Sequence, residues 1–463
     1  MKKLATYLYC LVFCTATAFG QFEEVLISDD FDNPDRLNLV DIENDGDFDL
    51  VVSESGTNKY YLIKYDAPSW SFEDPVVMID GDDWFSSCCV FTDQIHFEDI
   101  NSDGLVDAVA HFPGLTYGVV ASFLQVPTTG EFVLGSVLAT SDEFTTKNHF
   151  LNDLNDDGNI DFVIFNDFQF KMYAQLNDGS ANFATIADPL VEDVGYCINL
   201  EYLDIDLDGQ KDFVGMIFGG IFWMARQTDD SLIYGEREDL LSGIGSTSDF
   251  KLTDIDGDTD LDVIFASTDS DQITWAENID GMFNLGPLTI IGENLDYPRR
   301  LSLGDIDGDG LIDILATIRN DASIVWFKNL DGSGNYSDPI EITNSESLVY
   351  DAELVDVDAD GDLDIVSVAY GNNSVKLFEN MRILAIPDNE FAFSVYPNPA
   401  ADILRINSTK IFKHFAIYNL LGQKVLSHEF SEVIDVSVLA AGSYYLELST
   451  SDGYRSRERF VKM

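Results

Sequence analysis

Seven short segments of this chain carry acidic residues at alternate positions and close with one more aspartate. The pattern is Asp-x-Asp-x-Asp-Gly-x-x-Asp or a near variant, and it begins at Asp41, Asp99, Asp153, Asp204, Asp254, Asp305 and Asp356. Ca²⁺ prefers oxygen ligands in sets of six to eight. Each loop offers side chains at positions 1, 3, 5 and 9 and a carbonyl at position 7, and a glycine at position 6 allows the turn. We therefore expect up to seven structural calcium sites.

The expected ligands are the side chains at positions 1, 3, 5 and 9 of the seven loops. They are Asp41, Glu43, Asp45 and Asp49; Asp99, Asn101, Asp103 and Asp107; Asp153, Asn155, Asp157 and Asp161; Asp204, Asp206, Asp208 and Asp212; Asp254, Asp256, Asp258 and Asp262; Asp305, Asp307, Asp309 and Asp313; and Asp356, Asp358, Asp360 and Asp364. Loop 5 departs most from the pattern, because Thr259 replaces the glycine at position 6. A β-branched residue is costly at positive φ. Loop 5 is thus expected to turn differently or to bind more weakly.

The elements around the loops repeat with them. The steps between first aspartates are 58, 54, 51, 50, 51 and 51 residues. An apolar strand precedes each loop, a second follows it, and most periods add two further strands, which is typical of a propeller blade. We predict an all-β fold, a seven-bladed β-propeller followed by a small C-terminal β-sandwich; a linear solenoid is the alternative arrangement of the repeats.

The ends of the repeat region suggest how a ring would close. The pattern stops at Met381, before the fourth strand of the seventh period, whereas residues 22–28 (FEEVLIS) are similar to the fourth strand expected at 72–79. The N-terminal segment is therefore predicted to supply the missing strand. Such pairing would cover a sheet edge that is otherwise open.

The chain divides into four predicted parts. Residues 1–20 have the basic start and apolar run of a signal peptide, with an N-terminal membrane anchor as the alternative; no later segment is long and apolar enough to span a bilayer. The propeller covers 21–383, a linker 384–391 and the sandwich 392–463. The exported part keeps Cys88, Cys89 and Cys197. This odd number leaves open a vicinal disulfide, a bridge to Cys197, or inert thiols.

The charge of the chain limits its partners. Its net charge is −58, and residues 21–383 hold 15 basic against 74 acidic residues. Such a surface would repel nucleic acid. It would attract cations and keep the ring soluble.

Two resemblances follow from these motifs. The acidic loops and their period make residues 22–380 similar to the FG-GAP/VCBS repeat family, which includes the propeller of integrin α-subunits and implies Ca²⁺ in the loops. The last part resembles the type IX secretion sorting domain of Bacteroidetes, through Tyr396-Pro397-Asn398-Pro399-Ala400, Gly422-Gln423-Lys424-Val425, residues 439–445 (LAAGSYY) and the end FVKM. That resemblance implies contact with the type IX secretion machinery and a secreted or outer cell-surface location. The alternative for this part is an ordinary accessory sandwich.

The ligand of such a ring is expected on the face opposite the acidic loops. The longest step adds residues 80–94 there. Candidate ligand residues are Trp84, Phe85, His111, Tyr117, Lys147 and His149. We expect a binding or adhesion module for glycan or protein ligands. The alternative is a polysaccharide lyase or glycoside hydrolase, although His111 and His149 fit packed strand-end residues better than an acid–base pair, and no triad, zinc motif or nucleotide loop is present.

Overall fold

The chain forms two compact units with a boundary between Met381 and Arg382. The computed structural model describes residues 21–66, 71–85, 94–113, 118–140, 149–166, 169–186, 188–195, 197–227, 232–381, 394–408, 412–419, 424–431, 433–440, 442–449 and 455–463. Antiparallel strands make up nearly all of this structure, with one short helix, α1 (Gly81–Trp84), among those residues. No helix within the described ranges is both long and apolar enough to cross a membrane. The expected signal peptide and linker lie outside them.

The first unit contains seven four-stranded antiparallel sheets. Their first strands are β2 (Pro34–Val40), β8 (Ile95–Glu98), β12 (His149–Asn152), β16 (Cys197–Leu203), β20 (Thr247–Thr253), β24 (Pro298–Gly304) and β28 (Val349–Val355). Their second strands are β3 (Asp49–Glu54), β9 (Asp107–Phe112), β13 (Asp161–Asn166), β17 (Asp212–Ile217), β21 (Asp262–Ser267), β25 (Asp313–Ile318) and β29 (Asp364–Ala369). In all seven sheets the second strand begins at the last aspartate of an acidic loop.

The remaining strands complete the sheets on their outer side. The third strands are β4 (Lys59–Ile63), β10 (Val119–Gln125), β14 (Lys171–Asn177), β18 (Gly220–Met224), β22 (Gln272–Ala276), β26 (Ser323–Phe327) and β30 (Ser374–Asn380). The fourth strands are β7 (Val76–Asp80), β11 (Phe132–Thr140), β15 (Phe183–Thr185), β19 (Glu238–Ser242), β23 (Thr289–Glu293), β27 (Ile340–Thr343) and β1 (Phe22–Ser28). A small two-stranded hairpin, β5 (Tyr65–Asp66) with β6 (Ser71–Phe72), lies in the chain between the third and fourth strands of the first sheet.

The last sheet is completed from the other end of the sequence. Strand β1 runs antiparallel to β30, with Phe22 opposite Asn380 and Val25 opposite Leu377. Because β1 takes the outer position, the edge of β30 is paired rather than open to solvent.

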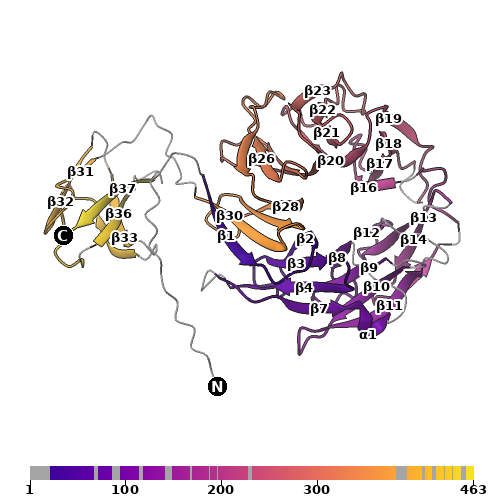
Figure 1. Cartoon of the computed structure of the whole chain (residues 1–463), viewed down its shortest axis with the longest axis horizontal. Helices are drawn as coiled ribbons and strands as arrows, with labels where there is room; N and C mark the ends of the chain where they lie inside the picture. The colour runs from indigo at the N-terminus through magenta and orange to yellow at the C-terminus, as the bar shows by residue number, and fades with distance from the viewer. Residues whose placement is uncertain are drawn as a thin grey trace. The chain divides into compact units, whose positions relative to one another are not determined.

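Hydrophobic clusters fill the space between each pair of neighbouring sheets. Seven such clusters lie among the described residues, and each combines side chains of two adjacent sheets. One of them joins Leu37 and Val52 of the first sheet to Val366 and Val375 of the last, so the sheets form a closed ring. The first strands line the middle of this ring (Figure 1). The second strands are buried over their whole length in most sheets, as expected for strands covered on both faces. The first unit is a β-propeller.

The second unit is a small β-sandwich. One sheet pairs β31 (Ser394–Tyr396), β32 (Ile403–Asn407) and β35 (Val433–Asp435). The other orders β34 (Lys424–Glu429), β33 (His414–Asn419), β36 (Gly442–Ser449) and β37 (Arg455–Lys462). The two sheets share a core that includes Leu404, Ile417, Leu446 and Phe460.

Candidate metal sites and the opposite face of the ring

All seven acidic loops lie on one face of the ring, because each connects the first strand of a sheet to the second. Neighbouring loops touch: the Asn44 side-chain amide in loop 1 donates a hydrogen bond to the Gly104 carbonyl in loop 2 at 3.2 Å. Between the third and fourth sheets, the buried Arg226 guanidinium of the fourth sheet lies 3.6 Å from the Asp156 carboxylate in loop 3. The seven loops together give this face of the ring an acidic rim.

Each loop wraps around its first aspartate. In loop 6 the N–H groups of Asp309 and Gly310 donate to the two carboxylate oxygens of Asp305, both at 2.9 Å. The same pair of bonds recurs in the loops that begin at Asp41, Asp99, Asp153 and Asp356. The first aspartate of each of these loops is thus held in place by the backbone of its own loop.

Position 4 contributes to the turn in a way that the sequence analysis missed. Its residues have φ between 55° and 82° in every loop, namely Asn44, Ser102, Asp156, Leu207, Gly257, Gly308 and Ala359. Only two of the seven are glycines, so the sequence carries little sign of this conformation. Two residues with positive φ, at positions 4 and 6, together fold each loop back on itself.

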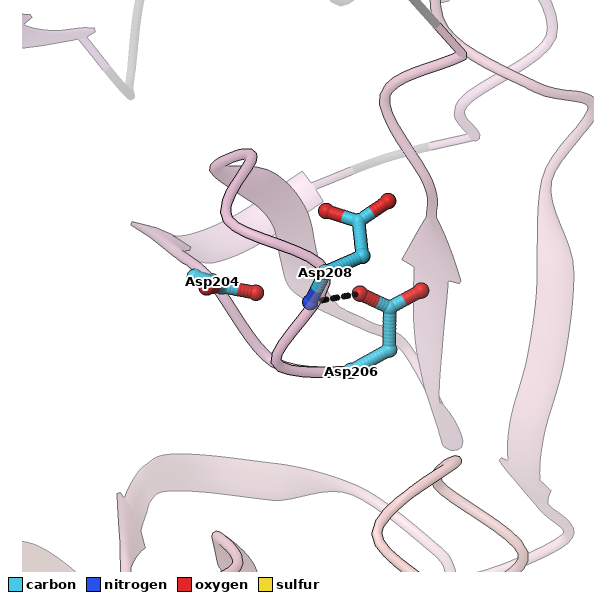
Figure 2. Close-up of side chains that lie close together, drawn as sticks. All are labelled: Asp204, Asp206 and Asp208. Atoms are coloured by element: carbon cyan, nitrogen blue, oxygen red, sulfur yellow. Dashed lines mark hydrogen bonds between the residues drawn. The ribbon is translucent and has the colours of Figure 1, made fainter.

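Four loops bring three carboxylates within 4.8 Å of one another. The groups are Asp204, Asp206 and Asp208; Asp254, Asp256 and Asp262; Asp305, Asp307 and Asp313; and Asp356, Asp358 and Asp360. Figure 2 shows the first group, where the Asp208 N–H donates to Asp206 and the three carboxylates approach each other. Oδ1 of Asp204 and Oδ1 of Asp307 are buried and accept no hydrogen bond from any described residue. Buried, donorless oxygens beside other carboxylates fit a hard cation such as Ca²⁺.

The aspartate at position 9 has a second role as an anchor within its sheet. Asp313 is fully buried and accepts hydrogen bonds from the N–H of Ile306 at 3.0 Å and of Asn329, at the end of the third strand, at 2.7 Å. Equivalent bonds hold Asp161, Asp262 and Asp364. Burial raises the pKa of Asp313 to about 6, despite the opposing effect of these N–H donors. Position 9 thus ties the loop to the sheet, and in loops 5 and 6 it also faces the acidic cluster.

Loop 5 keeps a positive φ at position 6 without a glycine, but the N–H that donates to Oδ1 of Asp254 comes from Gly257 at position 4, at 2.7 Å, and not from position 5 as in loop 6. Its turn therefore differs in part, and the weaker binding expected as the alternative stays a prediction. Thr259 has φ of 83°, just below the range of 84° to 97° that the glycines adopt at the same position of the other loops. Its N–H donates to Asp254 at 3.0 Å, as the glycine N–H does elsewhere. Hydrogen bonds and the anchored Asp262 impose this positive φ on Thr259, at the cost of backbone strain.

Lysines reach into two of the acidic loops. The ammonium group of Lys328 contacts Asp307 and lies 3.0 Å from Asp309 in loop 6. Lys64, at the equivalent place in the first sheet, contacts Glu43 in loop 1. In the seventh sheet this place holds Glu379, whose pKa is raised by burial and then by the charges of Glu23 and Asp360. The loops therefore differ in net charge although their backbones are alike.

The structure describes four of the six candidate ligand residues, and two of these four are buried. His111 and His149 are buried, with ring centroids 6.0 Å apart, and His96 lies 4.9 Å from His149. Phe85 packs on Phe112. Trp84 is 46% exposed at the end of α1. Tyr117, Lys147, Cys88 and Cys89 lie outside the described residues, and Cys197 is buried and donates to the Asn199 carbonyl.

A cavity of about 650 Å³ occupies the central channel and its mouth on the face opposite the acidic loops. The residues three and five positions before loops 1, 2, 4, 5 and 7 face it, because side chains of a strand alternate between its two sides. Arg36, Asp249, Arg300 and Asp351 belong to the ring five positions before the loops. Of the predicted ligand residues, the four that the structure describes (Trp84, Phe85, His111 and His149) do not line this cavity. Sequence reasoning missed it because it sought the ligand at the longest insertion instead of along the first strands.

Comparison with known protein families assigns both units. Residues 254–316 and 305–367 match the FG-GAP-like repeat, and residues 394–463 match the secretion system C-terminal sorting domain. The chain thus contains FG-GAP-like repeats in its first unit and a type IX secretion sorting domain as its second. This FG-GAP protein is therefore secreted or displayed at the cell surface. Its sorting domain implies contact with the secretion machinery.

Solved structures that resemble the FG-GAP protein do so at low identity. A lectin from Agrocybe aegerita that recognises non-reducing terminal N-acetylglucosamine is 18% identical, with a TM-score of 0.48, over 68% of this chain and 81% of the lectin. The extracellular domain of a one component system from B. thetaiotaomicron is 13% identical, with a TM-score of 0.48, over 96% of this chain and 59% of that one. The Dos1 propeller is 11% identical, with a TM-score of 0.43, over 72% and 75%. A search of curated proteins finds no match.

The matched FG-GAP repeats contain the acidic loops that begin at Asp254, Asp305 and Asp356. Loops 1 to 4 lie outside the matched residues but follow the same hydrogen-bonding scheme. The family match and the local geometry thus agree on where each repeat places its acidic loop.

Proposed function

We propose that this protein is a secreted or cell-surface binding module, for glycan or protein ligands, whose propeller is stabilised by calcium. The acidic rim supports the metal part of the proposal. Three carboxylates converge in each of four loops, and the donorless Oδ1 of Asp204 would otherwise stay uncompensated. Calcium would neutralise the rim and link the first two strands of each sheet.

The observation that carries the binding role is the channel cavity. Its volume of about 650 Å³ lies within the range of about 300–1,000 Å³ that is usual for small-ligand sites. Its wall comes from the first strands of several sheets, so the ring holds it rigidly. We base the proposal on binding rather than on lyase or glycosidase chemistry because His111 and His149, the expected acid–base candidates, are buried outside this cavity.

A glycan array tests the proposal directly. The chain from residue 21 onward, labelled and in calcium buffer, should be retained by at least one class of glycan and released by EDTA together with loss of the fold. An array of extracellular proteins, run in parallel, covers the protein-ligand alternative. Failure to retain any member of either array contradicts the binding role. Shortening of a retained glycan during incubation would instead identify an enzyme.

A further inference from the structure

The channel holds an unusual share of the few cations of this acidic protein. Arg36, Lys251, Arg299 and Arg300 all line the cavity, although residues 21–383 contain only 15 basic residues. Channels walled by protein concentrate the field of such groups more than an open surface does. The lining of the channel thus carries four basic against five acidic residues, a far more even balance than in the rest of this acidic protein.

Two of these cations are matched by acidic groups in the channel. The Arg300 guanidinium lies 3.9 Å from the Asp249 carboxylate and 3.7 Å from that of Asp351. Lys251 has a raised pKa, caused first by the charge of Asp249 and supported by Glu353 and Glu201. The positive charges of Arg300 and Lys251 are thus compensated by carboxylates in the channel wall.

Arg299 is different, because no described carboxylate lies within ion-pair distance of it. Its Nε donates to the Tyr350 carbonyl at 3.1 Å, and its guanidinium stacks on the Tyr350 ring, with Cζ 3.9 Å from the centroid. Burial, and then the charges of Arg300 and Arg36, lower the pKa of Arg299 to about 10. The group stays charged at neutral pH, and although the nearby charge of Asp351 favours it, no carboxylate of the described residues is in contact with this partly buried cation.

A second arginine shares the same tyrosine and lies beside Tyr297, a residue of the cavity wall. Nη2 of Arg319 donates to the Tyr350 hydroxyl at 3.0 Å, and its Cζ lies 5.1 Å from the Tyr350 ring and 5.2 Å from the Tyr297 ring. Among the described residues no carboxylate forms an ion pair with Arg319. Stacking on aromatic rings holds both guanidinium groups in place before a ligand arrives, which reduces the entropy lost on binding.

We propose that Arg299 and Arg319 bind a singly charged oxyanion of an acidic glycan, a uronate carboxylate or a sulfate ester. The planar guanidinium fork matches such groups. A doubly charged phosphate fits less well, because Asp249 and Asp351 line the same channel. The wall also carries amide and hydroxyl groups, such as those of Asn199 and Ser248, that suit sugar hydroxyls better than apolar peptide side chains. The inference rests on the proposed binding function and specifies its ligand.

Calorimetric titration of the chain from residue 21 onward tests this inference. The probes are trigalacturonate, a sulfated galactose trisaccharide and neutral galactotriose, all in calcium buffer. We expect one of the charged probes to bind, the neutral one to bind at least tenfold more weakly, and Arg299→Met to weaken charged binding at least tenfold. Which charged probe binds distinguishes carboxylate from sulfate.

Matched variants keep the test decisive. Arg237→Met is the control, because Arg237 also lies over an aromatic ring, that of Phe222, but pairs with Asp239 away from the channel mouth. Should Arg299→Met fail to fold, Arg319→Met serves in its place and should weaken binding as well. Charged binding that survives both substitutions, equal binding of galactotriose, or no binding of either charged probe overturns the inference. If the inference fails in this way but the arrays still retain neutral glycans, an acidic peptide or proteins, the general binding function remains intact.

Discussion

The ammonium group of Lys328 lies 3.0 Å from the Asp309 carboxylate, inside the acidic loop where a calcium ion would bind. A lysine in this place neutralises part of the loop and competes with the metal. A lysine that follows the third strand contacts loop 1 and another contacts loop 6, whereas Glu379 occupies the equivalent place beside loop 7. The seven loops are thus expected to differ in calcium affinity even though their backbones agree.

Replacing Lys328 by Met should raise the calcium affinity of loop 6 by roughly tenfold. Removal of one positive charge about 4 Å from the site changes the interaction energy by about 1 kcal/mol or more. Calcium titration followed by calorimetry would show an added tight site. Lys171→Met, which removes a lysine paired with Glu192 away from the loops, is the control and should leave the titration unchanged. Identical titrations for the two variants would refute competition by Lys328.

Removal of calcium should lower the melting temperature by roughly 10 °C or more. Each site filled at a hundredfold excess over its Kd stabilises the fold by about 2.7 kcal/mol, and several sites act together. The measurement is a thermal melt by circular dichroism in calcium and in excess EDTA. Added back after EDTA is removed, calcium should restore the original melt. A melt that EDTA leaves unchanged would show that the loops are stable without metal.

Substitution of Thr259 by Gly should stabilise the protein by about 1 kcal/mol. Thr259 has φ of 83°, a conformation that costs a β-branched residue energy and costs glycine little. Urea unfolding in calcium buffer measures the difference. The reverse change at the same position of loop 6, Gly310→Thr, should destabilise by a similar amount. If Thr259→Gly proves neutral or harmful, the strain attributed to this position is absent.

In EDTA, the two single variants Asp313→Ala and Asp309→Ala should lose different amounts of unfolding free energy. Asp313→Ala leaves the buried N–H groups of Ile306 and Asn329 without acceptors, which should cost about 3 kcal/mol of unfolding free energy. Asp309 lies at the surface of the loop, and its loss also relieves repulsion among the carboxylates, so a change of less than about 1 kcal/mol is expected. Urea unfolding of both variants checks this. Equal losses would mean that position 9 is not an anchor.

Much of the architecture could be predicted from local sequence. The spacing of the loops, the apolar runs on either side of them and the absent fourth strand of the last period are all legible in the sequence, because strand alternation and Asp-Gly turns act over a few residues. The glycines at position 6 also signalled the turn. The positive φ at position 4 could not be seen in the same way, since Leu207 and Ala359 adopt it only within the hydrogen-bonded loop.

The sequence by itself determined the repeat, its β-strands and the position of the acidic loops, because these depend on patterns within each period of about 50 residues. Only the tertiary structure decided which aspartates anchor their sheets and which face a common centre. It alone also brought Arg299, Arg319 and Tyr350 together beside the channel wall. These residues come from different strands and loops of two neighbouring sheets, so neither their spacing nor the net charge of the chain reveals that they form a cationic site.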